Sequence, residues 1–504
     1  MTKKHLNHLP WYIILTIIIL IFGLFLRLYQ LSSPSLWMDE GYSLNAAFAI
    51  LARGVPILDS GYPYWGAFPY TYLLAGIIKI FGLNLFFLRL PGVLVGSLFI
   101  LVFYYIVKKL FNRFTGILSA IFVGFSFWQI AWSRQIRMYI FVELFVWLSI
   151  YFFWKLITKK NNQKLLWSLL FLLVATVFHP VALLLLPVYF FFWFKYFPSQ
   201  HRKIGLLLLI ASPIFLEVLH YIFPNNIFSP LNLIKNNLVF HFYLPSFLEF
   251  FAHSWPIFSL LTIVGSIWLY INQKSKQALP FLLIIFLLPF IIFSFFFKSL
   301  IFRYLFVFTP VLFIIPAVFI VEIYQQTKSP TKKIIFFLAV LLPLFLTKEL
   351  ILIPQSFFAL ESSPESSTKS YLSYTPQPDF AAAYQIISSK IKPETVIVSA
   401  YPQFNKIYLN QPGYWLAFDY LGGQNPSRYI LADQHEIYAN SPVINNLEEL
   451  KKISSEKEIY VLYDQMARDR LDPDLINYIE TNFKLVFQKS TNRYSIIYLY
   501  QKSD

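Results

Sequence analysis

Long apolar stretches separated by short polar connections occupy residues 1–355 of the chain. A helix that crosses a bilayer needs about 20 mainly apolar residues, and by this criterion the sequence predicts roughly eleven membrane-spanning helices. They are expected at residues 10–29, 87–109, 114–132, 138–157, 164–179, 181–197, 203–223, 255–272, 278–297, 302–324 and 333–353. The first stretch follows Lys3 and Lys4, but it is long and lacks a small-residue cleavage pattern, so we interpret it as a retained helix.

The pattern changes after the last apolar stretch. A polar, Ser-rich segment indicates a linker at residues 356–378. In residues 379–504, segments with the pattern of helices alternate with segments with the pattern of strands. Helices are expected at Phe380–Lys390 and Pro473–Phe483, and strands are expected at Thr395–Ser399, Glu458–Tyr463, Leu485–Gln488 and Ser495–Tyr500. This alternation predicts a small α/β domain. It contains no P-loop or GxGxxG motif, so a recognition or support role is expected in place of nucleotide binding.

The composition excludes a soluble globular protein. Hydrophobic residues make up 57% of the sequence, charged residues make up 13%, and the mean hydropathy is +0.58, so the excess apolar surface must face lipid. The net charge of +16 does not indicate nucleic-acid binding, because the basic residues stand in short clusters between apolar runs. The absence of cysteine excludes disulfides, iron–sulfur clusters and a cysteine nucleophile.

The basic clusters also predict the orientation, because cytoplasmic connections are enriched in Lys and Arg. With the N-terminus inside, the cytoplasmic connections carry Lys108, Lys109 and Arg113; Lys155, Lys159, Lys160 and Lys164; Lys195, Arg202 and Lys203; Lys274 and Lys276; and Lys328, Lys332 and Lys333. An odd number of helices places residues 379–504 outside. We therefore expect a multi-pass protein of the cytoplasmic (plasma) membrane with an extracytoplasmic α/β domain. If the two runs beside His179-Pro180 formed one helix, the downstream topology would invert.

Basic residues at an outer membrane face are not expected from this enrichment of Lys and Arg on the cytoplasmic side, so their presence there suggests a specific role. Arg134 and Arg137 lie in one predicted outer turn, and Lys298 and Arg303 lie in another. Guanidinium groups at the interface can grip a phosphate or pyrophosphate head group while its lipid tail stays in the bilayer. The alternative is that each side chain only reaches lipid phosphates. Two clusters on one face favour a site.

The first outer loop, residues 30–86, carries an acidic pair, Asp39 and Glu40, at the start of an expected short helix. One of these carboxylates can act as a general base towards a hydroxyl, or the pair can simply favour the N-terminus of the helix. Adjacent helical residues point about 100° apart, so only one of the two is expected to meet an acceptor. His241 and His253 show no metal-ligand spacing, and we favour a reaction without a metal or cofactor, although the acidic pair leaves a divalent ion open.

Short motifs along the first 320 residues resemble the membrane glycosyltransferases of the C-type fold, in particular the branch of protein O-mannosyltransferases and the bacterial lipid A aminoarabinose transferase. The motifs are Trp37-Met38-Asp39-Glu40-Gly41, Pro69-Tyr70-Thr71-Tyr72-Leu73-Leu74, Leu88-Arg89-Leu90-Pro91-Gly92, Ser133-Arg134 to Arg137-Met138-Tyr139, His179-Pro180, and Arg303-Tyr304-Leu305 with Pro310. The resemblance implies that residues 1–355 form a transmembrane glycosyltransferase domain that includes the loop 30–86.

The resemblance also implies an activity. The enzyme would transfer a glycosyl group from a polyprenyl-phosphate sugar to a hydroxyl of a glycan, lipid or protein at the outer membrane face, with inversion. Asp39, beside Glu40, would be the base. Arg137 and Arg303 would hold the donor phosphate within a set that also contains Arg134, Lys298, Tyr139, His179 and Tyr304. Many relatives have an acidic residue where this chain has Gln135, so no role of that carboxylate carries over.

Two other functions stay open. An oligosaccharide ligase or polymerase that uses a lipid-pyrophosphate glycan would share the outer-face site, and the length of its donor would distinguish it. A non-enzymatic transporter or flippase would place ionisable residues deep within its helices. Glu143 and Glu217 are the main acidic candidates there, and this sparse distribution argues against a charge-driven transporter.

Overall fold

The computed structural model describes residues 10–159, 163–196, 238–352, 378–419, 426–490 and 496–502, together with scattered positions between 207 and 235. About half of the helix expected at 203–223, and the expected linker apart from Pro378, lie outside the described residues. Contacts divide the chain into two compact units, of which the first contains Met1–Tyr29 and Arg89–Pro354 and the second contains Gln30–Leu88 and Gln355–Asp504. The loop 30–86, which the resemblance assigns to the transmembrane domain, thus packs with the C-terminal domain.

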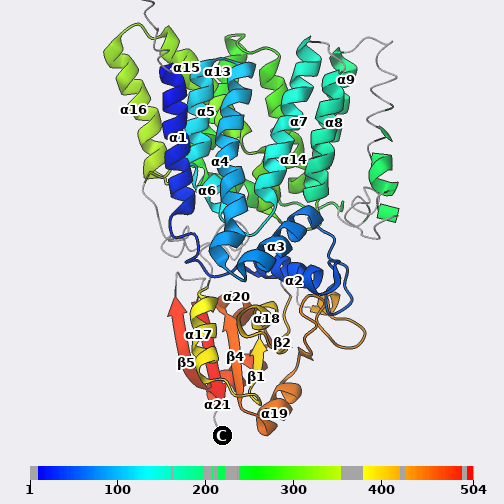
Figure 1. The fold of residues 1–504 in the computed structure, drawn as a ribbon. Coiled ribbons are helices and arrows are strands. Elements are labelled where there is room, and N and C mark those ends of the chain that lie inside the picture. Colours follow the sequence, from blue (N-terminus) through cyan, green and yellow to red (C-terminus); the bar gives the residue numbers. More distant parts are fainter. Residues whose placement is uncertain are drawn as a thin grey trace, which may run out of the picture. The chain divides into compact units, whose positions relative to one another are not determined.

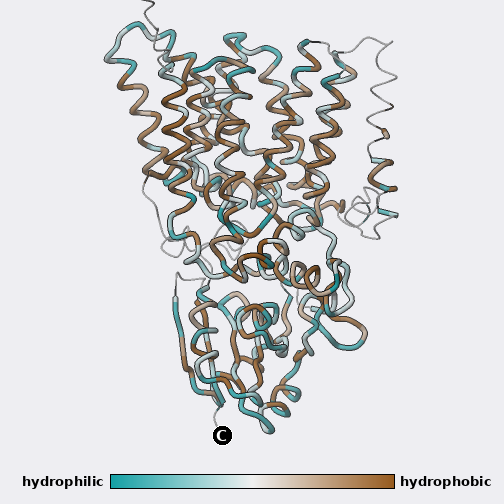
Figure 2. The backbone as a smooth tube through the Cα atoms, viewed as in Figure 1, coloured by the Kyte–Doolittle hydropathy of each residue, from teal (hydrophilic) through white to brown (hydrophobic). Residues whose placement is uncertain are grey.

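The first unit is a set of apolar helices (Figure 1). They are α1 (Trp11–Leu28), α4 (Leu85–Leu110), α5 (Arg113–Phe125), α6 (Phe127–Ser133), α7 (Tyr139–Lys159), α8 (Gln163–Phe178), η1 (Pro180–Leu184), α9 (Leu185–Tyr196), α12 (Leu244–Ser254), α13 (Pro256–Ile271), α14 (Ala278–Phe295), η2 (Phe302–Phe308), α15 (Val311–Gln326) and α16 (Pro330–Leu346). Figure 2 shows hydrophobic residues along most of these helices and polar residues near their ends. Among the described residues, four helices are long and apolar enough to cross a membrane, or up to six if each bent pair is one span. The protein is a multi-pass membrane protein.

The helix expected at 114–132 is not continuous. It divides at Ser126, whose backbone leaves the helical conformation between α5 and α6. A neighbouring segment satisfies the backbone groups at the break: Ile351 donates its N–H to the Phe125 carbonyl at 2.9 Å, and Phe127 donates its N–H to the Glu349 carbonyl at 3.2 Å. Such pairing is needed because lipid offers no hydrogen bonds. The last expected helix, at 333–353, correspondingly ends at Leu346, and this segment follows it.

Glu349 also stabilises a second interruption between helices, at the junction where α12 and α13 meet at an angle of 105°. Its two carboxylate oxygens accept the backbone N–H groups of Ile257 and Phe258, each at 2.8 Å. These donors belong to the first turn of α13 and have no partner within that helix. A buried carboxylate thus caps a helix that Trp255 and Pro256 begin.

The second unit combines the loop helices α2 (Met38–Arg53) and α3 (Phe68–Phe81) with the C-terminal α/β domain. That domain contains α17 (Phe380–Lys390), β1 (Val396–Ser399), α18 (Gln403–Leu409), β2 (Tyr414–Leu416), η4 (Pro426–Tyr429), β3 (Val443–Ile444), α19 (Leu447–Glu456), β4 (Ile459–Asp464), α20 (Gln465–Arg468), α21 (Pro473–Asn482), β5 (Lys484–Ser490) and β6 (Ile496–Lys502). The predicted α/β class is confirmed, and the expected helices and strands agree to within three residues at each end.

The sheet has the order β3-β2-β1-β4-β6-β5, in which β3, β2, β1 and β4 are parallel and β6 pairs antiparallel with both β4 and β5. Every residue of β4 is buried, as expected for a central strand that is covered on both faces. Short helices flank the sheet (Figure 1). Helix α18 follows β1 directly, so it begins at the edge formed by the carboxyl ends of the parallel strands.

Candidate functional site

A cluster of arginine and aromatic side chains forms in the membrane unit from three separate parts of the chain. Arg137 lies in the turn before α7, Tyr139 is the first residue of α7, His179 precedes η1, and Arg303 and Tyr304 lie in η2. The Arg303 Nε donates a hydrogen bond to the Tyr139 hydroxyl at 3.2 Å. The His179 ring centroid lies 5.3 Å from that of Tyr139 and 4.9 Å from that of Tyr304. Five of the sequence-predicted phosphate-binding residues are therefore neighbours.

The cluster concentrates positive charge and hydrogen-bond donors. The guanidinium carbon of Arg137 lies 5.8 Å from the centre of the Tyr139 ring, and the charges of Arg137 and Arg303 both act on His179. The His179 Nδ1 accepts the Val181 N–H at 3.2 Å, so a neutral imidazole carries its proton on Nε2. Two guanidinium groups, a phenol and an imidazole together suit an oxyanion such as a phosphate. Trp132, which packs edge-on against Tyr139 at 5.0 Å, belongs to this cluster, and sequence analysis missed it because it stands within an apolar run.

Arg134 and Lys298 are placed differently from the other predicted phosphate ligands. Arg134 is buried, and its Nη1 donates to the backbone carbonyls of Leu26 at 3.1 Å, Arg27 at 3.2 Å and Tyr29 at 2.5 Å. These are carbonyls at the C-terminal end of α1, where a cation is favoured. Lys298 is exposed between α14 and η2, and its recorded contact is made by its backbone carbonyl, which accepts the Tyr243 hydroxyl at 3.1 Å. The geometry therefore favours Arg137 and Arg303 over these two residues as phosphate ligands.

Asp39 and Glu40 occupy the first turn of α2 in the other unit and are both buried. The Glu40 Oε2 accepts the Trp37 N–H at 2.8 Å, as the third residue of a capping box does. This hydrogen bond gives the Glu40 carboxylate a structural role at the start of the helix. Asp39 instead accepts the Ser43 hydroxyl at 3.2 Å through its backbone carbonyl. Asp39 stays the predicted base.

Within the described part of the chain, no group of three or more His, Asp or Glu side chains is arranged to hold a metal ion. His241 stacks on Tyr243 with 5.3 Å between the ring centroids, which gives this histidine a packing role. Gln135 lies in the same turn as Arg137 and is partly buried.

Comparison with known proteins agrees with this architecture. The model of the family described as dolichyl-phosphate-mannose-protein mannosyltransferase matches residues 67–221, less than half of the chain. The crystal structure of ArnT from Cupriavidus metallidurans in the apo state is similar over 97% of both chains, with 12% identity and a TM-score of 0.59. ArnT bound to undecaprenyl phosphate matches 97% of this chain and 98% of its own, with 13% identity and a TM-score of 0.56.

A third solved structure is the archaeal oligosaccharyltransferase AglB from Archaeoglobus fulgidus in complex with an inhibitory peptide and a dolichol-phosphate. It covers 91% of this chain and 70% of its own, with 11% identity and a TM-score of 0.52. Comparison with curated protein sequences gave no significant match. The chain thus has the fold of the C-type membrane glycosyltransferases, as its motifs predict.

Proposed function

We propose that this protein transfers a glycosyl group from a polyprenyl-phosphate-linked sugar to an acceptor hydroxyl at the outer face of the membrane. The observation that carries the proposal is the cluster of Arg137, Tyr139, His179, Arg303 and Tyr304 in the membrane unit. A phosphate on a long lipid suits such a cluster, because arginine binds the phosphate oxygens bidentately while the lipid stays in the membrane. The fold supports the same class of donor, since ArnT has been solved with undecaprenyl phosphate and AglB with a dolichol-phosphate.

In the proposed reaction, Asp39 takes the proton of the acceptor hydroxyl as its oxygen attacks the anomeric carbon. The bond between that carbon and the donor phosphate oxygen breaks, and the polyprenyl phosphate leaves as an anion that Arg137 and Arg303 stabilise. A single direct displacement inverts the anomeric configuration. A positioned base typically contributes about 10²–10⁴-fold, and electrostatic stabilisation of the leaving phosphate adds a factor of about 10²–10³.

The likeness to AglB favours a second candidate, the transfer of an oligosaccharide from a lipid carrier. The motif resemblance to the protein O-mannosyltransferases and the aminoarabinose transferase implies a single-sugar donor. We therefore place a monosaccharide donor first.

The test uses purified full-length protein and a panel of radiolabelled polyprenyl-phosphate sugars, with Asp39→Asn as the control. Transfer or release of label by the wild type but not by the variant supports the proposed reaction and the assignment of the base. Activity with oligosaccharide carriers alone supports the second candidate. If the folded wild type uses neither class of carrier, the proposal is wrong.

A further inference from the structure

Side chains of the C-terminal domain pack against the backbone of the helix that carries Asp39. Two residues after Asp39, Gly41 faces the first turn of α18: a Cβ at Gly41 would lie 2.8 Å from the Gln403 Cγ and 3.0 Å from the Phe404 Cε1. Cβ atoms in proteins essentially never lie closer than 3.0 Å to such a heavy atom, so the 2.8 Å distance leaves no room for a side chain. The glycine in the Asp39-Glu40-Gly41 motif thus lets α18 approach the first turn of α2.

Tyr438 of the C-terminal domain packs against Tyr42, the residue that follows Gly41 in α2. The Tyr438 ring stacks on Tyr42 with 4.1 Å between centroids and meets the edge of Tyr62 at 5.7 Å. Buried Glu436 shapes the turn that presents Tyr438, because its Oε2 accepts the N–H groups of Tyr438 at 2.9 Å and Ala439 at 2.6 Å. The position of Tyr438 is therefore determined by hydrogen bonds within the C-terminal domain.

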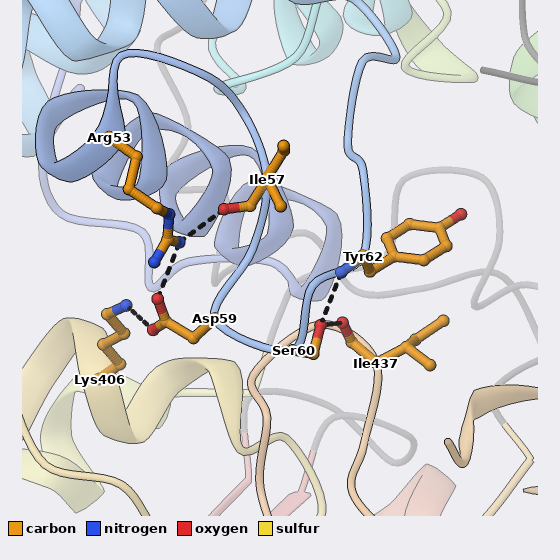
Figure 3. A network of polar contacts seen from close by, with 7 residues as sticks. All are labelled: Arg53, Ile57, Asp59, Ser60, Tyr62, Lys406 and Ile437. Atoms are coloured by element: carbon orange, nitrogen blue, oxygen red, sulfur yellow. Dashed lines mark hydrogen bonds and ion pairs between the residues drawn. The ribbon is translucent and has the colours of Figure 1, made fainter. Parts of the chain in front are cut away.

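Polar contacts attach the loop on both sides of α2. After the helix, Asp59 accepts hydrogen bonds from Arg53 at 2.9 Å and from Lys406 of α18, and the Ser60 hydroxyl donates to the Ile437 carbonyl (Figure 3). Before the helix, the Ser35 hydroxyl donates to Asp379 at 2.8 Å. The C-terminal domain consequently holds α2 before its start, in its first turns and after its end.

We propose that the C-terminal domain is a positioning element of the active site, with Tyr438 and α18 setting the orientation of α2 and hence of the Asp39 carboxylate. The inference rests on the proposed function. Tyr438 is a positioning residue, since it acts through Tyr42 and α2. Because a displacement of about 1 Å can cost about 10²-fold in rate, loosening this packing lowers turnover without changing the phosphate-binding cluster.

The experiment compares Tyr438→Ala with Tyr438→Phe, which keeps the ring, in the full-length protein. We expect Tyr438→Ala to lower kcat at least about tenfold, to leave the Kd for polyprenyl phosphate unchanged, and to accelerate amide exchange in residues 38–53. Tyr438→Phe should show wild-type values for all three properties. Lys406→Met, which removes the Asp59 contact, should act in the same direction to a smaller extent and serves if Tyr438→Ala does not fold.

The matched control is Ile479→Ala, because Ile479 is fully buried in α21, which packs on β6. This variant should accelerate exchange in α21 while kcat stays near the wild-type value. Wild-type kcat in Tyr438→Ala and Lys406→Met would overturn the positioning role, as would unchanged exchange in α2. If the wild type transferred no sugar, the proposed function would fail instead, and the exchange data would still decide whether the C-terminal domain holds α2.

Discussion

Arg303 and Tyr139 are 164 positions apart in the sequence, yet the Arg303 Nε donates a hydrogen bond to the Tyr139 hydroxyl at 3.2 Å. The bond joins η2 to the first residue of α7 and fixes the guanidinium beside the ring that also faces His179. Arg303 is partly exposed, whereas Tyr139 is fully buried. The phenol thus orients a guanidinium group of the proposed phosphate site.

Tyr139→Phe should weaken the binding of polyprenyl phosphate several-fold, because it removes the hydrogen bond that orients the Arg303 guanidinium while keeping the ring. Arg137→Ala should weaken binding more strongly and lower turnover as well, since it removes a charge. Titration of the purified variants with polyprenyl phosphate measures both effects. Unchanged affinity in Arg137→Ala would remove this residue from the phosphate site.

The two carboxylates of α2 should respond differently to amide substitution. Asp39→Asn should lower turnover at least about 10²-fold with donor binding intact, because an amide cannot accept the proton. Glu40→Gln should retain most activity, since a glutamine can still accept the Trp37 N–H in the capping box. Single-turnover rates at saturating donor distinguish the variants. Equal losses in both would assign Glu40 a chemical role as well.

The sequence predicts local features of this chain well. The acidic pair, the following glycine and Pro69 stand where α2 and α3 begin, and Gly54, at a φ of +76°, ends α2 as a left-handed C-cap. His179 separates α8 from η1 and α9, as expected, because its backbone is extended and Pro180 follows. These boundaries depend on neighbouring residues, so periodicity and capping signals are sufficient to find them.

Features that depend on distant partners were not predictable. The break at Ser126 has no proline and is stabilised by Glu349 and Ile351, more than 200 positions later in the sequence. The sequence places Arg134 and Arg137 in one turn and gives them the same chemistry, and only the position of the α1 carbonyls separates their roles. The contact of α18 with α2 likewise requires Gly41 and Gln403 to meet, which no local pattern indicates.

This difference between the two arginines can be tested. Arg134→Met should lower the thermal stability of the protein, because it leaves buried carbonyls at the end of α1 without their donor at a cost of about 1–3 kcal/mol each. The affinity of the folded fraction for polyprenyl phosphate should stay within a few-fold of the wild type. Thermal unfolding and lipid titration on the same preparations make the comparison. A loss of affinity as large as that of Arg137→Ala would return Arg134 to the phosphate site.

Glu436 should make the stability of the second unit depend on pH. Burial raises the pKa of Glu436 to about 8, against the lowering effect of the N–H bonds from Ala439 and Tyr438. A carboxyl group whose pKa is higher in the folded state than in the unfolded state binds its proton more tightly when the protein is folded. The stabilising effect of the Glu436 proton is therefore fully present below the pKa of the unfolded state and is lost as the pH rises through about 8. We therefore expect amide exchange around residues 436–441 and in α2 to accelerate between pH 6 and pH 8.5, after correction for the intrinsic effect of pH. Burial also raises the pKa of Asp464, to about 6, so this aspartate contributes mainly at the lower end of that range. Glu436→Gln should remove the upper part of the dependence, and an unchanged slope in that variant would show that another group is responsible.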